Sequence, residues 1–118
     1  MTVSAPRFFT MPDTPDFIVI LTNTASLEEA KQISYRLITD KLAACVNIFK
    51  NECSLYEWQG KVCEESEFQL VIKTQNSLYS HVETVIRELH SYEVPEIIAL
   101  AVENGSSDYL EWIKKSTT

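Results

Sequence analysis

The residues with the clearest potential for chemistry are the cysteines and histidines, because thiolate sulfur and imidazole nitrogen are the donors that suit copper and zinc. The chain has three cysteines, Cys45, Cys53 and Cys63, and two histidines, His81 and His90. The cysteines form an odd set without CxxC spacing, so they do not predict a structural zinc site. In a reducing compartment we expect all three to be thiols.

Of the two histidines, His90 is the stronger candidate metal ligand. It falls at the end of a predicted helix, before a loop that contains Glu93 and Glu96, so its imidazole could bind a cation with one of these carboxylates. The alternative is a histidine that caps the carboxyl end of the helix and is stabilised by the helix dipole. His81 falls on the polar side of the same helix and is expected at the surface.

Cys45 is the second candidate metal ligand. We expect it beside Lys73 on the mixed face of a β-hairpin, where the ammonium would favour the thiolate form. The alternative is a small buried residue at a subunit contact. Cys53 and Cys63 are expected diagonally across the same hairpin, about 7 Å apart. Together they could hold Cu(I) in a linear site or oxidise to a disulfide.

Several classes of function lack support. The chain has no GxSxG, HExxH or phosphate-loop motif, and its two glycines cannot form a glycine-rich cradle, so we do not expect an enzyme. A net charge of -7 and no basic cluster longer than Lys114–Lys115 argue against nucleic acid binding. No apolar run approaches the roughly 18 residues of a membrane span. Residues 1–15 do not resemble a signal peptide, which predicts a cytoplasmic location.

The candidate ligands depend on a long β-hairpin for their positions. Two apolar runs, residues 42–49 and 68–73, flank the polar segment Glu57–Lys61, whose glycine marks a turn. Pairing the ends of that segment, Glu57 with Lys61, sets Val46 opposite Ile72. In this register one face of the hairpin is almost wholly apolar, which supports the pairing.

The predicted hairpin is longer than its domain. Strands of about 14 residues would reach roughly 45 Å, whereas a compact domain of this size is about 35 Å across. The tip, with Tyr56 and Trp58, would therefore expose aromatic side chains and strand edges, which proteins normally cover. We infer that neighbouring subunits cover them. The alternative is a hairpin bent by a bulge near residues 50–53 back onto its own monomer.

The other elements complete a known arrangement. We expect a strand at Phe17–Leu21, a helix from Ser26 to about Asp40, a second helix from Gln75 to about His90, a strand at Ile97–Val102 and a helix at Asp108–Lys115. Ser26 and Glu29 have capping-box spacing. The order predicts an α+β, ferredoxin-like split βαβ fold, with an antiparallel sheet and two helices on one face. We expect a single domain over residues 16–118 after a loose tail over residues 1–15.

Five segments carry a resemblance to a known family. They are Lys41–Ile48 (KLAACVNI), Ser54–Lys61 (SLYEWQGK), Ile72–Thr74 (IKT), His90–Ile97 (HSYEVPEI) and Asp108–Trp112 (DYLEW). In order and spacing they resemble the motifs of the CutA divalent-cation tolerance proteins. The resemblance implies a ferredoxin-like fold and a homotrimer joined by long hairpins, similar in architecture to the PII signalling proteins. It also implies a role in tolerance of copper and other divalent metals.

The resemblance further implies particular site residues. The copper site of the bacterial proteins needs a cysteine at the end of the first strand and two histidines at the end of the second helix. Here these positions are Thr22, Leu89 and His90, so one ligand of three is kept. Four more residues match recurring motif positions and could converge in a cleft between subunits or form an interface ion pair bordered by aromatics: Trp58, Lys73, Tyr92 and Glu96.

These inferences lead to one prediction and one alternative. We predict a non-enzymatic, cytoplasmic homotrimer that binds copper or another divalent cation, with no resident cofactor required. The alternative is a PII-like signalling or scaffold trimer that binds a small molecule or a partner protein in the clefts between its subunits.

Overall fold

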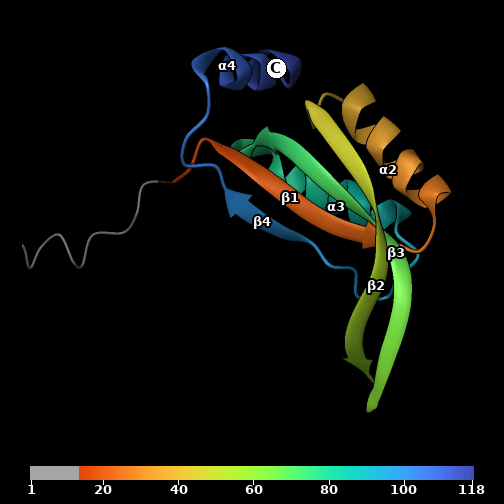
Figure 1. Ribbon diagram of the computed structural model, residues 1–118. Helices are drawn as coiled ribbons and strands as arrows, with labels where there is room; N and C mark the ends of the chain where they lie inside the picture. Colours follow the sequence, from red (N-terminus) through yellow and green to blue (C-terminus); the bar gives the residue numbers. More distant parts are fainter. Residues whose placement is uncertain (1–13) are drawn as a thin grey trace, which may run out of the picture.

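The computed structural model of this chain describes residues 14–118, which form a mixed α+β fold (Figure 1). The elements are β1 (Phe17–Thr24), α2 (Leu27–Thr39), β2 (Cys45–Trp58), β3 (Lys61–Gln75), a 3-10 turn (Asn76–Leu78), α3 (Tyr79–Leu89), β4 (Ile98–Ala101) and α4 (Ser107–Ser116). The predicted order of elements is therefore confirmed. The predicted tail over residues 1–15 lies outside the described residues except for its last two. No helix within the described region has the length and apolar character needed to cross a membrane.

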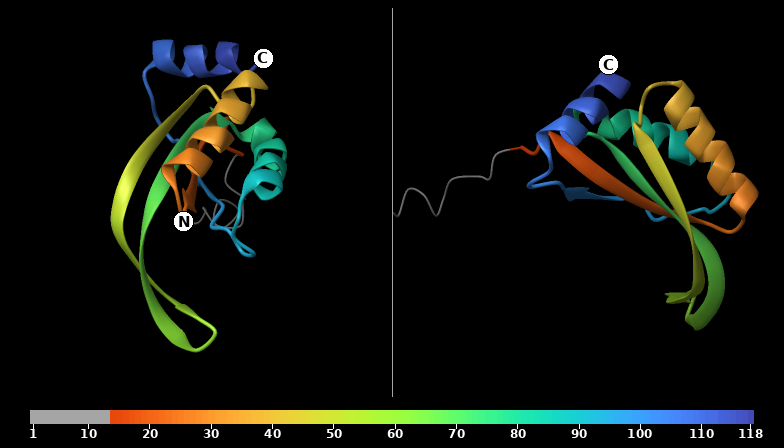
Figure 2. Two further views of the ribbon diagram at one scale, coloured as in Figure 1. Left: turned by 90° about the vertical axis from the view of Figure 1, so that its right-hand side faces the viewer. Right: turned by 45° about the horizontal axis from the view of Figure 1, so that its top comes forward.

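The four strands form one antiparallel sheet in the order β2-β3-β1-β4. Helices α2 and α3 cover one face of this sheet (Figure 2), while α4 packs at the end of β3. The core lies between the sheet and these two helices, and its fully buried members include Ile20, Leu70, Ile72, Ile33, Leu37, Val82 and Ile86. This is the ferredoxin-like arrangement that the sequence predicts.

The first and last helices begin at capping serines, of which Ser26 was predicted from its spacing to Glu29. Ser26 Oγ accepts a hydrogen bond from the Glu29 amide at 3.1 Å, and Ser106 Oγ accepts one from the Tyr109 amide at 3.3 Å. Each bond satisfies a backbone donor that has no partner within the helix. This local chemistry explains why the starts of α2 and α4 could be predicted from the sequence.

The hairpin of β2 and β3 has the predicted register at its base and a different one at its tip. Val46 pairs with Ile72 as expected, and a bulge interrupts the pairing between Asn51 and Ser54. Beyond the bulge the register shifts by one residue, so the predicted pairing of Glu57 with Lys61 is wrong and Trp58 pairs with Lys61 instead. The shift leaves a two-residue turn, Gln59 and Gly60, with φ of 51° and 83°. Positive φ at both positions is the conformation that matches the twist of paired strands.

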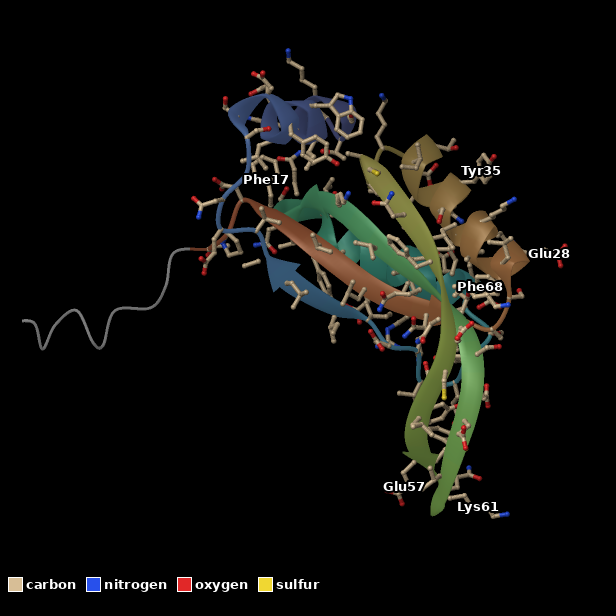
Figure 3. All side chains as sticks on the ribbon, in the orientation of Figure 1. Phe17, Glu28, Tyr35, Glu57, Lys61 and Phe68 are labelled. Atoms are coloured by element: carbon tan, nitrogen blue, oxygen red, sulfur yellow. The ribbon has the colours of Figure 1, made fainter. Side chains whose placement is uncertain are left out.

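The hairpin extends well beyond the layer of sheet and helices, as predicted from its length. Figure 3 shows Glu57 and Lys61 at a tip that hangs free of the helices. The chain measures 52 × 39 × 23 Å, with a radius of gyration of 17.0 Å, compared with about 13 Å for a compact domain of this size. Val62, near the tip, is 77% exposed. The alternative of a hairpin folded back over its own monomer is therefore excluded.

The sheet face opposite α2 and α3 is rich in exposed apolar side chains. It includes Phe49, which is 57% exposed, and Ile98 and Leu100 of β4, each about half exposed. Cys45 and Lys73 pair on the same face, as predicted from the register. We call this surface, which Phe49, Ile98 and Leu100 define, the helix-free face.

Candidate functional cleft

A large concave surface lies between the overhanging hairpin and the loop that joins α3 to β4. This cleft has a volume of about 840 Å³. Its carboxylates come from Glu65 and Glu67 of β3 and from Glu93 and Glu96 of the loop. Its other lining side chains include Asn23, Gln69, Tyr56, Trp58, Tyr92 and Cys63. None of the described residues that line it is lysine, arginine or histidine, so its lining is acidic.

The alternation of strand positions explains why two carboxylates lie in the cleft. Residues two apart in a strand point to the same face, so Glu65, Glu67 and Gln69 of β3 share one side. Asn23 pairs with Gln69 at the end of β1 and joins the same row. The overhang of the hairpin leaves the outer part of this row uncovered by its own chain, whereas Glu67, further in, is only 5% exposed.

Glu67 is held by a tyrosine of the loop. Tyr92 Oη donates a hydrogen bond to Glu67 Oε2 at 2.7 Å. Burial, and next the hydrogen bond to Glu67, raise the pKa of Tyr92 well above its ordinary value. The phenol therefore stays protonated and remains a donor to the carboxylate, and it ties the loop to the hairpin.

A second tyrosine and carboxylate lie further out along the hairpin. The interaction with Glu65 is the main cause that raises the pKa of Tyr56 to about 12. Tyr56 and Glu65 thus repeat, at the exposed end of the cleft, the combination that Tyr92 and Glu67 form at its buried end. The cleft presents two carboxylates that are each associated with a phenol.

Asn23 forms the floor of the cleft and has an unused acceptor. Its Nδ2 donates to Glu96 Oε1 at 3.0 Å, which sets the orientation of the amide because a carboxylate can only accept. Its Oδ1 is buried and accepts no hydrogen bond from any residue within 14–118. The side chain as a whole is 8% exposed. A buried acceptor without a donor is uncommon in folded proteins and calls for an explanation.

His90 supports the loop from behind the cleft. Its side chain is fully buried, and Nε2 lies 2.6 Å from the carbonyl oxygen of Asn23, to which it must donate. Nδ1 accepts from the Tyr92 amide at 3.1 Å and lies 3.4 Å from Glu29 Oε2. Both ring nitrogens are therefore occupied, in the tautomer with hydrogen on Nε2. As the C-cap of α3, His90 connects the helix end to β1 and positions Tyr92.

The predicted metal ligands do not come together in one chain. Cys45 pairs with Lys73, whose other partner on β1 is Val19, whereas His90 contacts Asn23 at the far end of β1. Thr22, at the position of the family cysteine, is fully buried and offers a hydroxyl instead of a thiolate. No group of three histidine, cysteine, aspartate or glutamate side chains within 14–118 is arranged to hold a metal ion. A copper site of cysteine and histidines is therefore not preformed in this chain.

The two cysteines of the outer hairpin lie on opposite faces, so their predicted diagonal pairing is wrong. Cys53 lies in the bulge with its Sγ 3.8 Å from Glu64 Oε1, whereas Cys63 pairs with Tyr56. Glu64 and Cys63 are adjacent in β3 and therefore point to opposite sides. The extra residue of the bulge moves Cys53 to the Glu64 side. All three cysteines of the sequence are free thiols.

Within one chain, three of the four residues predicted at a cleft between subunits line the same cleft, and the fourth lies elsewhere. Trp58, Tyr92 and Glu96 line the cleft. Lys73 lies near α4, with its Nζ 5.9 Å from the centre of the Tyr109 ring, so only a second subunit could bring a Lys73 to this cleft. Neither Glu65 nor Glu67 was predicted at the site, although their spacing of two residues indicates that both share a face of the hairpin.

Comparison with known proteins shows extended similarity. The family model described as CutA1 divalent ion tolerance protein matches residues 18–116. The protein CutA, chloroplastic, of Arabidopsis thaliana is 44% identical over 100 residues, which are 85% of this chain and 55% of that protein. The chain thus spans about half the length of that relative. The divalent-cation tolerance protein CutA of Thermus thermophilus is 39% identical over 84% of this chain and 96% of its own length. The crystal structure of CutA1 from Shewanella sp. SIB1 superposes with a TM-score of 0.86 at 34% identity, covering 89% of this chain and 98% of that one.

Proposed function

The chain belongs to the CutA1 divalent ion tolerance protein family, and from this premise we propose that it binds divalent cations, copper among them, as a homotrimer. The observation that carries the proposal is the cleft, whose lining includes Glu65, Glu67, Glu93 and Glu96 and no basic side chain of the described residues. Carboxylate oxygens are ligands for divalent cations, and a concave acidic surface raises their local concentration. The role is one of binding and not of catalysis, and we assign it to the cytoplasm.

The trimer is supported by two surfaces that a monomer would leave exposed. The helix-free face carries Phe49, Ile98 and Leu100, and the hairpin tip carries Leu55 and Val62, all substantially exposed. Exposed apolar clusters of this kind are usual at subunit contacts. A closed ring can cover both surfaces because the hairpin of each subunit reaches across to the next.

A neighbouring subunit would also complete the cation site. One chain has no group of three ligands already in place, so full coordination requires groups from a second copy or water. Cys63, which is partly buried in the cleft, adds a sulfur donor that favours copper over magnesium.

Metal uptake by the reduced full-length chain tests the proposal. We expect stoichiometric binding of Cu²⁺ and Mn²⁺ in equilibrium dialysis at physiological salt, and a trimer in native mass spectrometry. The double substitution Glu65→Gln and Glu67→Gln should reduce uptake at least tenfold. Glu28→Gln with Glu111→Gln removes the same charge from α2 and α4, outside the cleft, and should leave uptake unchanged.

Two results would contradict this function. Equal uptake by the cleft variant and its control would mean that the carboxylates of the cleft are not the ligands. A monomeric mass at micromolar concentration would remove the basis for a site completed by a neighbour.

A second candidate function is a small-molecule cleft in a PII-like trimer. The observation in its favour is size, since about 840 Å³ falls within the range of ligand pockets and far exceeds the volume of an ion. Indifference to copper, together with a bound metabolite in the native mass spectrum, would favour this candidate over the first.

A further inference from the structure

We propose that the cleft binds a free organic cation with primary ammonium groups, of the class of short aliphatic polyamines. This inference rests on the second candidate function, a small-molecule cleft, and names the chemical class of its ligand. Three features of the cleft carry it: the spacing of the carboxylates, the unused acceptor of Asn23, and the aromatic side chains between them.

The carboxylates are arranged in a row and not around a point. Glu65 and Glu67 lie two residues apart on one face of β3, which separates their positions by roughly 6.7 Å. Glu93 and Glu96 face this row from the loop. A metal ion needs its ligands within about 2.6 Å of one centre, and no such group of three exists within the described residues. An elongated cation with charges at intervals along its length matches a row of carboxylates.

The unpaired acceptor of Asn23 would be satisfied by a ligand that donates hydrogen bonds. Its Oδ1 is a buried acceptor without a donor, and its amide cannot be reversed because Nδ2 already donates to Glu96. A primary ammonium carries three N–H donors. At the floor of the cleft one ammonium could donate to Asn23 Oδ1 and to the carboxylates of Glu67 and Glu96 together. Its binding would satisfy an acceptor that the protein leaves unpaired.

Aromatic side chains fit the parts of such a ligand that lie between its charges. Tyr56, Trp58 and Tyr92 all line the cleft. Aromatic faces attract organic cations and pack against methylene groups, whereas a hydrated metal ion gains little from them. Tyr92 and Tyr56 are neutral phenols at neutral pH, as tyrosines ordinarily are, and the raised pKa of each keeps them neutral at higher pH. They therefore offer the ligand uncharged ring faces.

Titration of the assembled full-length protein with spermidine tests the inference. The chain has two tryptophans, so a Trp112→Phe background leaves Trp58 in the cleft as the reporter of fluorescence. We expect a saturable change of Trp58 emission at physiological salt, and Mg²⁺ at equal ionic strength should neither cause nor reverse it. Glu65→Gln with Glu67→Gln should weaken binding at least tenfold, and Glu28→Gln with Glu111→Gln should not.

The controls separate this inference from the functions on which it builds. If the double cleft variant fails to assemble, Glu93→Gln, at an exposed position of the loop, replaces it and should weaken binding severalfold.

Copper uptake without spermidine binding overturns the polyamine ligand and leaves the divalent-cation function standing. Spermidine binding without copper uptake overturns the divalent-cation function alone. Displacement by Mg²⁺ at equal ionic strength would show that an inorganic divalent cation takes the site, and undiminished binding to the cleft variants would show that the carboxylates are not the ligands. Either result would overturn the inference. A basic side chain of a neighbouring subunit that fills the cleft would also overturn the inference.

Discussion

Replacing Tyr92 with phenylalanine probes the bond that ties the loop to the hairpin. Tyr92 Oη donates to Glu67 Oε2 at 2.7 Å, and Glu67 is almost completely buried. A hydrogen bond to a charged group contributes about 1.5–3 kcal/mol to stability, and the partial exposure of Tyr92 places this one at the lower end. We expect Tyr92→Phe to lower the free energy of unfolding by about 1.5 kcal/mol at pH 7.

The same bond predicts that the free energy of unfolding of the wild type and that of Tyr92→Phe respond differently to alkaline pH. The pKa of Tyr92 is raised in the folded state, first by burial and then by the bond to Glu67. The folded protein therefore retains a proton that the unfolded chain releases near pH 10. The stability that this proton contributes is complete below pH 10 and is lost as the pH rises through the folded pKa. Tyr92→Phe has no such proton, so its free energy of unfolding should fall less than that of the wild type above pH 10.

Urea unfolding followed by far-UV circular dichroism measures both effects, at one fixed protein concentration because the assembly makes stability depend on concentration. Tyr35→Phe is the matched control, since Tyr35 is 73% exposed on α2 and far from the hairpin tip (Figure 3). Equal stability of Tyr92→Phe and wild type at pH 7, with parallel curves above pH 10, would refute the role given to this bond.

Three further substitutions test the assembly, a helix cap and the hairpin turn. Phe49→Glu places a charge on the helix-free face and should yield monomers in size-exclusion chromatography with light scattering, whereas Tyr35→Glu should stay assembled; an intact Phe49→Glu trimer would exclude this face from the contact. Ser26→Ala removes the acceptor for the Glu29 amide and should lower the free energy of unfolding by about 1 kcal/mol in urea; no loss would mean that water replaces the cap. Gly60→Ala, at a φ of 83° with no atom near the added methyl, should cost about 1–2 kcal/mol. Gly60→Asn should cost less because asparagine tolerates positive φ, and equal losses would show that backbone conformation is not the cause.

The candidate site was only partly visible in the sequence. Trp58, Tyr92 and Glu96 were identified through motif resemblance, and the structure brings them into one cleft. Lys73 was placed with them across a contact between subunits, and within one chain it lies at the other end of the sheet, near Tyr109, so its place in the cleft stays a prediction. Asn23 was missed because its amide becomes notable only where β1 meets Glu96, a residue 73 positions away along the chain.

His90 illustrates the same limit. Its position at the end of α3 followed from helical periodicity. The partners of its imidazole did not, because the Asn23 carbonyl is 67 residues away in the chain. A sequence shows that a histidine ends a helix, whereas the direction of its ring depends on how the helix packs against the sheet.

By itself the sequence determined the elements, their order and the length of the hairpin. These depend on local hydrogen bonds at caps and turns and on the periodicity of apolar residues, which a linear sequence records directly. Tertiary structure alone decided the register beyond the bulge, the faces taken by Cys53 and Cys63, and the meeting of loop and hairpin around the cleft. One inserted residue reverses every later side chain of a strand, and contacts between distant segments arise only when the core packs. The chemistry of this protein depends on those contacts.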